Sequence, residues 1–250
     1  MGKIDTLRRI LRHARHLGPS GGWQAARMIA GRDRLVRLRV RGLPQPIWVR
    51  AGTADVETFE EIFLARHYEL PFPEFHPRFV LDLGANIGLA SIRFAARWPA
   101  ARILAVEPAE ENFALLQRNT GAYPMIARDR AAVWAHAAEL AILNPGDAAN
   151  AFRLGTAAAG PAAAAVPGRT IDEFATRFGC GAWNLVKMDV EGAEAEILNA
   201  NTRWLDAVSV LVIELHDRIC PGCTEALCSA LRDRRFRMEI VGANLAFDFR

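Results

Sequence analysis

VLDLGANIGLASIRFAARWPAARILAVEP, residues 80–108, decides how this chain folds. A short apolar run ends at Asp82, a glycine-containing turn follows, and a helical pattern leads to a second apolar run that ends at Glu107. Uninterrupted apolar runs are typical of parallel strands, because such strands are buried on both faces. The stretch therefore predicts two parallel strands joined by a helix, with both acids at the carboxyl edge of the sheet, where open α/β sheets bind ligands.

The turn after the first strand, DLGANIG, indicates what that ligand is. Gly84 and Gly88 allow a tight turn and a close approach of backbone to ligand, and the next helix points its free N–H groups into the same crevice. In the dinucleotide pattern G-x-G-x-x-G the middle glycine admits a pyrophosphate, but here that position is Asn86. Asp82 suits a cationic amine, and Glu107 can accept hydrogen bonds from both hydroxyls of a ribose. A ribose joined to an amino acid, without phosphate, describes S-adenosylmethionine.

These features also have purely structural explanations. A single glycine-rich turn between a strand and a helix occurs in many α/β proteins. Glu107 alone could be an acid favoured by the dipole of the helix that follows it. The assignment gains weight because a second acidic block repeats the same arrangement.

NLVKMDVEGAEAEIL, residues 184–198, is that second block. Its apolar run ends at Asp189, which should face the same crevice, and a helix opens shortly after Glu191. Acids at such a place can serve as a general base, a metal site or helix N-terminal charges. We favour a functional role for Asp189 and Glu191, and interpret Glu194 and Glu196 as helix charges.

The next apolar run, VSVLVIELH at 208–216, ends in Glu214 and His216. Strand side chains alternate with a period of two, so these two should project from the same side. The histidine could be a base near neutral pH, or equally a hydrogen-bonded structural residue.

Apolar runs alternate with helical patterns from residue 79 onward, which predicts an open, mainly parallel α/β sheet. The expected strands are 80–83, 102–107, 125–127, 185–189, 208–215, 236–241 and 245–249, and the expected helices are 88–97, 110–119, 193–199 and 223–232. The low-complexity stretch 155–170 is interpreted as a loop.

The N-terminal segment differs from the rest in charge. Residues 1–50 hold 12 Lys and Arg against 2 Asp and Glu, whereas the chain as a whole has a net charge of only +3. Residues 3–17 predict a basic amphipathic helix, and 35–50 a β-hairpin. We therefore divide the chain into an N-terminal extension, 1–51, and a catalytic domain, 52–250. The extension could pack on the domain, join a homodimer, or contact an anionic membrane or acidic glycan.

Composition and sequence pattern indicate where the protein is located and in which state its cysteines are. The 250 residues are 51% hydrophobic, no secretory leader is visible, and no apolar run approaches the roughly 20 residues of a membrane span. A cytoplasmic protein is expected, with peripheral contact at the inner membrane surface as an option. Cys220, Cys223 and Cys228 lie near His216 and could hold zinc, but a second close cysteine pair is absent, which disfavours a metal. Free thiols are expected there and at Cys180.

The chain resembles the FkbM family of S-adenosylmethionine-dependent methyltransferases. The resemblance covers residues 52–217 and rests on VLDLGANIGLASI, AVEPAEENFALLQRN, RTIDEF, LVKMDVEGAEAEIL and VLVIELH, in that order. It implies a class I methyltransferase sheet of seven strands, mostly parallel, with the last antiparallel. It also implies cofactor-binding roles for Asp82, Gly84, Ala85, Asn86, Gly88 and Glu107, and active-site roles for Asp189 and Glu191.

The implied reaction is O-methylation of a hydroxyl on a sugar, glycan, glycolipid or related natural product. We place His216 beside Asp189 and Glu191 as the catalytic group, with His216 or Asp189 as the base and a divalent metal optional. Two alternatives stay open: a non-catalytic module that binds S-adenosylmethionine, and an NAD-dependent oxidoreductase, which Asn86 disfavours. Nucleic acid is not expected as a partner, because the chain beyond residue 50 is acidic.

Overall fold

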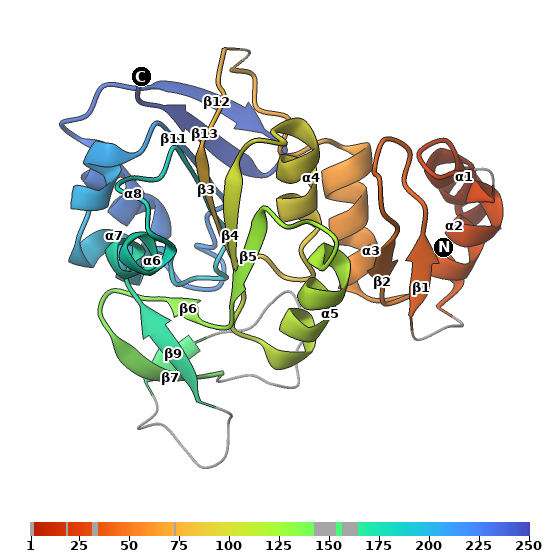
Figure 1. The fold of residues 1–250 in the computed structure, drawn as a ribbon, viewed down its shortest axis with the longest axis horizontal. Helices are drawn as coiled ribbons and strands as arrows, with labels where there is room; N and C mark the ends of the chain where they lie inside the picture. The colour runs from red at the N-terminus through yellow and green to blue at the C-terminus, as the bar shows by residue number, and fades with distance from the viewer. Residues whose placement is uncertain (1–2, 19, 32–34, 73, 143–153, 157–164) are drawn as a thin grey trace.

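A seven-stranded sheet runs through the middle of the protein in a computed structural model that describes residues 3–18, 20–31, 35–72, 74–142, 154–156 and 165–250 (Figure 1). The strands lie in the order β12-β13-β11-β10-β3-β4-β5. Their bounds are β3 (Phe79–Leu83), β4 (Arg102–Val106), β5 (Ile126–Asp129), β10 (Leu185–Met188), β11 (Val210–Ile213), β12 (Arg237–Val241) and β13 (Asn244–Asp248). The pairs from β5 to β11 are parallel, and β13 is antiparallel to both of its neighbours. The predicted sheet is confirmed, including its antiparallel last strand.

The order of the strands fixes where a ligand can bind. From β3 the chain first adds β4 and β5 on one side, and later β10 and β11 on the other. This reversal makes the carboxyl ends of β3 and β10 a topological switch point, where open α/β sheets have their crevice. The acids predicted at the strand ends therefore meet at one edge.

Helices cover both faces of the sheet (Figure 1). They are α4 (Leu89–Arg97), α5 (Glu110–Thr120), α6 (Ile171–Phe178), α7 (Glu194–Ala200) and α8 (Cys223–Leu231), with a short 3-10 helix at Arg203–Ala207. Two large apolar clusters separate the helices from the sheet, and successive residues of β3, Val80 and Leu81, belong to different clusters. This is the two-sided burial that the uninterrupted apolar runs predict.

A second, four-stranded sheet was not predicted. It consists of β6 (Ala132–Val133), β7 (Ala138–Ile142), β8 (Leu154–Thr156) and β9 (Val166–Arg169). The interpretation of 155–170 as a loop is wrong at β9 and at the end of β8, while 157–164 lie outside the described residues. Gly168 of β9 packs so closely that a Cβ there would lie 2.8 Å from the Leu140 Cδ1 atom. The small residues of this stretch allow the strands to pack closely. Their low sequence complexity is the reason why the stretch was interpreted as a loop.

The N-terminal segment forms α1 (Lys3–Ala14), α2 (Gly21–Ala30) and a hairpin of β1 (Val36–Leu38) and β2 (Ile47–Val49). The first helix and the hairpin were predicted, and α2 was not. Next come α3 (Ala54–Phe59) and a π-helix, Glu60–Leu64. One apolar cluster includes Leu17 and Met28 of the segment together with Leu116 of α5. The boundary between residues 51 and 52 stays a prediction, and the two sides share a core.

None of the helices in the described ranges has both the length and the apolar character needed to cross a bilayer.

Candidate functional site

A cavity opens at the carboxyl edge of the sheet, at the switch point beside β3 and β10. It contains about 1120 Å³ of empty space, including open solvent at its mouth. Its lining includes four of the six predicted cofactor residues, Gly84, Ala85, Asn86 and Glu107, and all three predicted catalytic residues, Asp189, Glu191 and His216.

The turn after β3 forms one wall of the cavity. Gly84 has φ +71°, and a Cβ on it would lie 1.8 Å from the carbonyl oxygen of Asp189. The close approach that requires glycine is thus to the second acidic block, and not only to a ligand. Asn86 also adopts a left-handed conformation, with φ 48°. Its Oδ1 atom is buried and receives no hydrogen bond from the described residues, which leaves an acceptor at the cavity wall for a bound molecule.

Glu107 follows β4 and lines the same wall. Its two oxygens accept hydrogen bonds from the backbone N–H of Asn86 at 2.9 Å and of Ala109 at 3.0 Å. Burial raises the pKa of Glu107 to about 7, although these hydrogen bonds and one from Asn112 lower it. A carboxylate oxygen has two lone pairs, so Glu107 keeps capacity for further donors such as ribose hydroxyls.

Two predicted cofactor residues, Asp82 and Gly88, are not part of the cavity lining. Asp82 is fully buried below the turn, where the hydroxyl of Ser91 donates to its Oδ2 atom at 2.6 Å. Its Oδ1 atom lies 3.3 Å from the ammonium of Lys187. Because Asp82 already has these partners, we assign it to holding the turn, rather than to a ligand's amine.

Lys187, a residue that the sequence reasoning missed, joins the two acidic blocks. Its ammonium, on a side chain only 3% exposed, donates to the carbonyl oxygens of Leu83 at 3.2 Å and Gly84 at 2.7 Å. It also lies 3.4 Å from a carboxylate oxygen of Asp189. Burial lowers the pKa of Lys187, but the anionic groups around it, including Asp82, raise it to a net value above the ordinary one. Lys187 therefore stays charged. The sequence did contain a signal for this role, because a lysine within an apolar strand must find anionic partners when it is buried.

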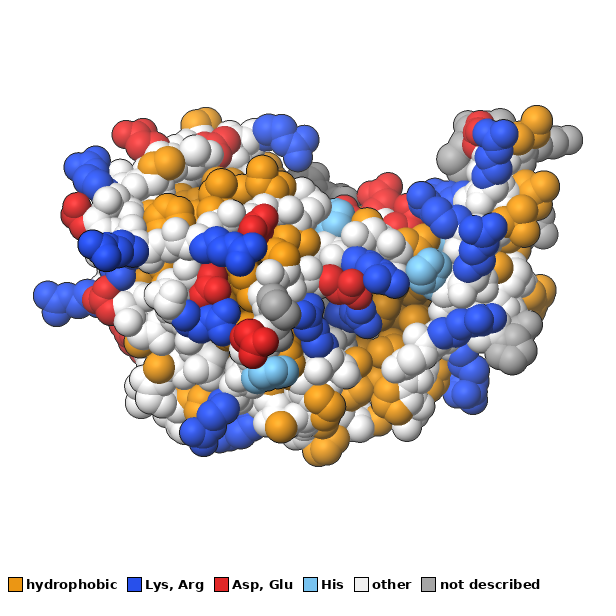
Figure 2. Space-filling view, turned by 90° about the horizontal axis from the view of Figure 1, so that it is seen from above, with side chains coloured by type: hydrophobic (Ala, Val, Ile, Leu, Met, Phe, Trp, Pro, Cys, Tyr) orange, Lys and Arg blue, Asp and Glu red, His pale blue; other side chains and the backbone are white. Residues whose placement is uncertain are grey.

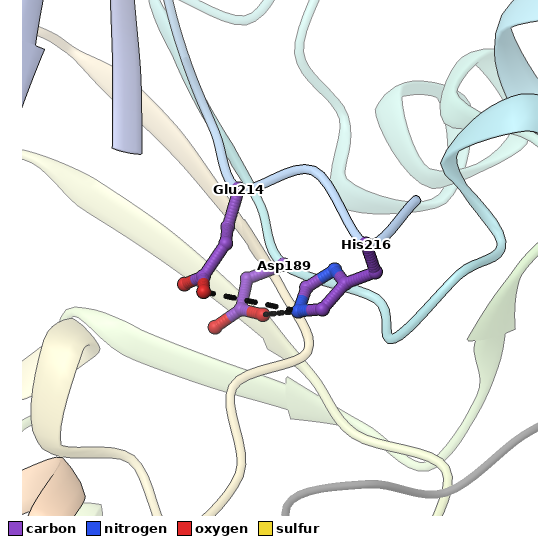
Figure 3. Close-up of side chains that lie close together, drawn as sticks. All are labelled: Asp189, Glu214 and His216. Atoms are coloured by element: carbon purple, nitrogen blue, oxygen red, sulfur yellow. Dashed lines mark ion pairs between the residues drawn. The ribbon is translucent and has the colours of Figure 1, made fainter. Parts of the chain in front are cut away.

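The opposite wall of the cavity carries a group of acids around one histidine. Asp189, Glu214 and His216 point toward one another from the ends of β10 and β11 (Figure 3). The Nε2 atom of His216 lies 3.7 Å from Asp189, 3.9 Å from Glu214 and 3.5 Å from Glu191. Glu191 occupies a left-handed turn position, with φ 53°. Such backbone strain often accompanies functional sites. The expectation that Glu214 and His216 share a side is confirmed.

Glu194 sets the state of this histidine. Its side chain is fully buried, and its Oε1 atom lies 2.7 Å from the Nδ1 atom of His216. The interpretation of Glu194 as a simple helix charge is therefore wrong, whereas Glu196 is exposed as expected. Burial lowers the pKa of His216, but the hydrogen bond and charge of Glu194, with those of Glu191 and Asp189, raise it to about 9. His216 is thus protonated at neutral pH, so of the two bases considered, His216 or Asp189, the histidine is not free to take a proton.

Two carboxyl groups that line the cavity, Glu191 and Glu61, hold their protons more tightly than usual. Burial, followed by the charges of Asp189 and Glu214, raises the pKa of Glu191 to about 7, against the lowering effect of His216. Burial and the charges of Glu214 and Asp189 likewise raise the pKa of Glu61, at the cavity rim, to about 7. Glu61 was also missed, because it comes from the π-helix far from both motifs. A carboxyl group with a pKa near the working pH is suited to accept a proton.

One cation site can be drawn within the described part of the chain. Asp189, Glu214 and His216 each offer a ligand atom, and the three atoms lie within 4.8 Å of one another. No other group of three metal-ligating side chains occurs among the described residues. The cysteines therefore form no such site there. Cys223 is buried with its thiol 3.3 Å from Glu194, while Cys228 is exposed.

Known proteins resemble this chain in sequence and in fold. The family model described as the methyltransferase FkbM domain matches residues 82–238. "Methyltransferase 1" of Beauveria bassiana (strain ARSEF 2860) is 38% identical over 71 residues, which is 28% of each chain. "Methyltransferase sdnD" of Sordaria araneosa is 41% identical over 61 residues, 24% of this chain and 23% of that one. The matched segments thus span little more than a quarter of these relatives.

Among solved structures, the precorrin-6y C5,15-methyltransferase of Geobacter metallireducens GS-15 aligns over 70% of this chain and 69% of its own. The identity is 15% and the TM-score 0.39, which adds nothing to what the strand order already shows.

Replacing Lys187 with Met should destabilise the fold strongly. The change leaves the buried Asp82 carboxylate without its cation, and breaking a buried ion pair costs about 3–5 kcal/mol. Urea unfolding measures the loss. Arg237→Met is the matched control, because it removes an exposed pair with Glu239, worth about 1 kcal/mol at most. Adding Asp82→Asn to Lys187→Met should restore part of the stability. A loss no larger than that of Arg237→Met would contradict the assigned role.

His216 should titrate near pH 9 in NMR spectra, and Glu194→Gln should lower its pKa. The folded-state pKa lies above that of an unfolded histidine, about 6.5, so the interaction stabilises the protein fully below that pH. The stabilisation is lost as the pH rises through about 9. His67 serves as the internal reference, since burial lowers its pKa. Titration of His216 at or below 6.5 in the wild type would refute this account.

Proposed function

The chain belongs to the FkbM methyltransferase family, and from this premise we propose that it is an S-adenosylmethionine-dependent O-methyltransferase. Its acceptor is a hydroxyl of a sugar, glycan, glycolipid or related natural product. The observation that carries the proposal is the two-sided cavity. One wall presents Asn86 and Glu107 with free acceptor capacity, and the facing wall presents the carboxylates around His216.

The first wall fits the cofactor by the chemistry of its donor and acceptor groups. Glu107 would take the ribose hydroxyls, and the unpartnered Oδ1 atom of Asn86 would accept a hydrogen bond from the methionine end. Val106, Ala131 and Val133 add an apolar surface suited to a flat base. When bound, S-adenosylmethionine supplies an activated methyl group on a sulfonium. The backbone of the turn fixes its orientation, because Lys187 holds the carbonyl oxygen of Gly84.

The facing wall suits an acceptor rich in hydroxyl groups. Ionised carboxylates only accept hydrogen bonds, and sugars are dense in hydroxyl donors. An anionic group on the acceptor would instead be repelled by Glu61, Asp189 and Glu214 at the point of reaction. This supports a polyhydroxylated acceptor with a neutral reacting end.

Proton transfer from the acceptor is assigned to Glu191. Methyl transfer to a hydroxyl oxygen forms an O–C bond, breaks the S–C bond and releases the hydroxyl proton, which a base must take. His216 is already protonated at neutral pH and serves to orient the carboxylates. Glu191 has a pKa near 7, is 24% exposed and lies 3.5 Å from His216. Asp189, held by Lys187, is placed to accept a hydrogen bond from the same hydroxyl.

Incubation with S-adenosylmethionine and a panel of sugars, glycans and glycolipids tests the proposal, with mass spectrometry for products that carry one added methyl group. Methylated product with S-adenosylhomocysteine in equal amount supports it. Cofactor binding without product from any panel member would favour a non-catalytic binding module. Repeating the assay with a chelator separates a metal-assisted route through Asp189, Glu214 and His216 from direct proton transfer.

Glu107→Ala should weaken binding of S-adenosylmethionine by about tenfold or more. A hydrogen bond to a charged group contributes about 1.5–3 kcal/mol, and 1.4 kcal/mol is a factor of ten in affinity. Isothermal titration calorimetry gives the dissociation constants. Glu110→Ala is the control, because Glu110 is an exposed acid three residues away. Equal affinities for the wild type and Glu107→Ala would remove the ribose assignment.

Glu191→Gln should reduce turnover by about 10²–10⁴-fold, the usual contribution of a general base, with little change in cofactor affinity. The wild type should lose kcat/KM as the pH falls through about 7, where Glu191 becomes protonated, and the variant should lack this limb. Glu196→Gln, an exposed acid on the following helix, is the control. If kcat/KM of Glu191→Gln still falls as the pH drops through about 7, another group accepts the proton.

A further inference from the structure

The outer side of α1 is apolar and faces away from the protein. Ile4, Leu7 and Leu11 are 70%, 57% and 56% exposed. At 3.6 residues per turn these three positions form a single stripe along the helix. For this segment the sequence left three options open: packing on the domain, a homodimer, or contact with an anionic membrane or acidic glycan. The structure leaves these three residues uncovered.

The helix is already anchored through its other side, so the stripe is not a core contact that failed to form. His13 is fully buried, with its Nε2 atom 2.9 Å from Glu60. Ile10 packs against the apolar cluster, and Arg9 pairs with Glu60 at 2.5 Å. The inward face of α1 is therefore complete without Ile4, Leu7 and Leu11.

The neighbouring helix α2 adds an exposed aromatic residue at this end of the protein. α1 and α2 pack against each other, and Trp23 of α2 is 63% exposed. The guanidinium of Arg27 lies 4.4 Å from the centre of its ring. An exposed tryptophan beside an arginine is the combination that lipid headgroup regions favour, because each has an apolar body and a polar end. We define the N-terminal apolar face as Ile4, Leu7, Leu11 and Trp23.

Positive charge borders this face. Arg8, Arg12 and Arg15 are exposed, and neither Arg8 nor Arg15 forms an ion pair within the described ranges. By helical geometry Arg8 and Arg12 lie along one edge of the stripe. Figure 2 shows hydrophobic and basic side chains side by side over the N-terminal helices, with few acids. Arg9 and Arg12 are partly neutralised by Glu60, so the free charge comes mainly from Arg8 and Arg15.

We propose that the N-terminal apolar face docks on an anionic bilayer, with Ile4, Leu7, Leu11 and Trp23 inserted among the lipids and Arg8 and Arg15 on the headgroups. Charge complementarity selects the occupant: an apolar stripe bordered by unpaired arginines matches a surface that is apolar inside and anionic outside. A second copy of the chain would instead bring like-charged arginines together.

The anchored side of α1, opposite the docked face, contacts the π-helix that borders the cavity. Glu60, which holds α1, is followed by Glu61, which lines the cavity, and both belong to that π-helix. The docking itself does not depend on the proposed methyl transfer.

Co-sedimentation of the full chain with vesicles tests the docking. One set consists of phosphatidylcholine, the other of phosphatidylcholine and phosphatidylglycerol in equal parts, each at low and high salt. The wild type should bind the anionic vesicles at low salt about tenfold or more tightly than the neutral ones, and high salt should weaken binding. Equal binding to both vesicle types, or no binding to either, would overturn the proposal.

Variants locate the binding surface. Ile4→Ser, Leu7→Ser and Leu11→Ser together should lower anionic vesicle binding by about tenfold or more. Met238→Ser with Ile240→Ser is the matched control, because these residues of β12 are 47% and 71% exposed away from α1. Arg8→Gln with Arg15→Gln should reduce binding and its salt dependence. If the triple-serine variant bound anionic vesicles as well as the wild type does, this face would not be the docking surface. The proposal would also be refuted if the wild type were a dimer, the triple-serine variant were a monomer, and neither protein bound vesicles. That result would assign the face to a second copy of the chain.

Discussion

The ammonium of Lys187 is the contact on which the site depends. It is buried between two neighbouring strands and reaches the carbonyl oxygens of Leu83 and Gly84 as well as the carboxylates of Asp82 and Asp189. A buried charge is costly unless it is paired and hydrogen-bonded, and here its hydrogen-bond and ion-pair partners, Asp82, Leu83, Gly84 and Asp189, lie at the ends of β3 and β10. The two acidic blocks are therefore held at one fixed spacing, close enough that only glycine fits at position 84.

That spacing gives the cavity two chemically different walls. On the β3 and β4 side, backbone N–H groups hold Glu107 in place, and its remaining lone pairs are acceptors in fixed positions. On the β10 and β11 side, Asp189, Glu191 and Glu214 surround one histidine. Burial and the neighbouring charges raise the pKa of Glu191 to about 7 and that of Glu214 above its ordinary value. Fixed acceptors suit a cofactor that must be oriented, whereas acids with shifted pKa values suit an acceptor that must lose a proton.

Much of this arrangement could be predicted from the sequence, for identifiable reasons. Apolar runs that lead into an acid predicted the central strands β3, β4, β10 and β11, because these strands are buried on both faces. The placement of Asp189 and His216 in one cavity followed from parallel topology. The sequence did not predict Glu194 and Lys187 as the partners of His216 and Asp189. These two residues act through contacts between different strands and helices, and the spacing of residues along the chain does not encode such contacts. The four small strands were hidden because alanine, glycine and proline mask strand periodicity.

A crystal structure of the chain with S-adenosylhomocysteine tests the central claim most directly, namely that the β3 and β4 wall holds the cofactor and the β10 and β11 wall receives the acceptor. The account predicts ribose hydroxyls on Glu107, and the sulfur atom facing the space between Asp189, Glu191 and His216. A ligand bound elsewhere, or one whose sulfur points away from these three residues, would contradict it.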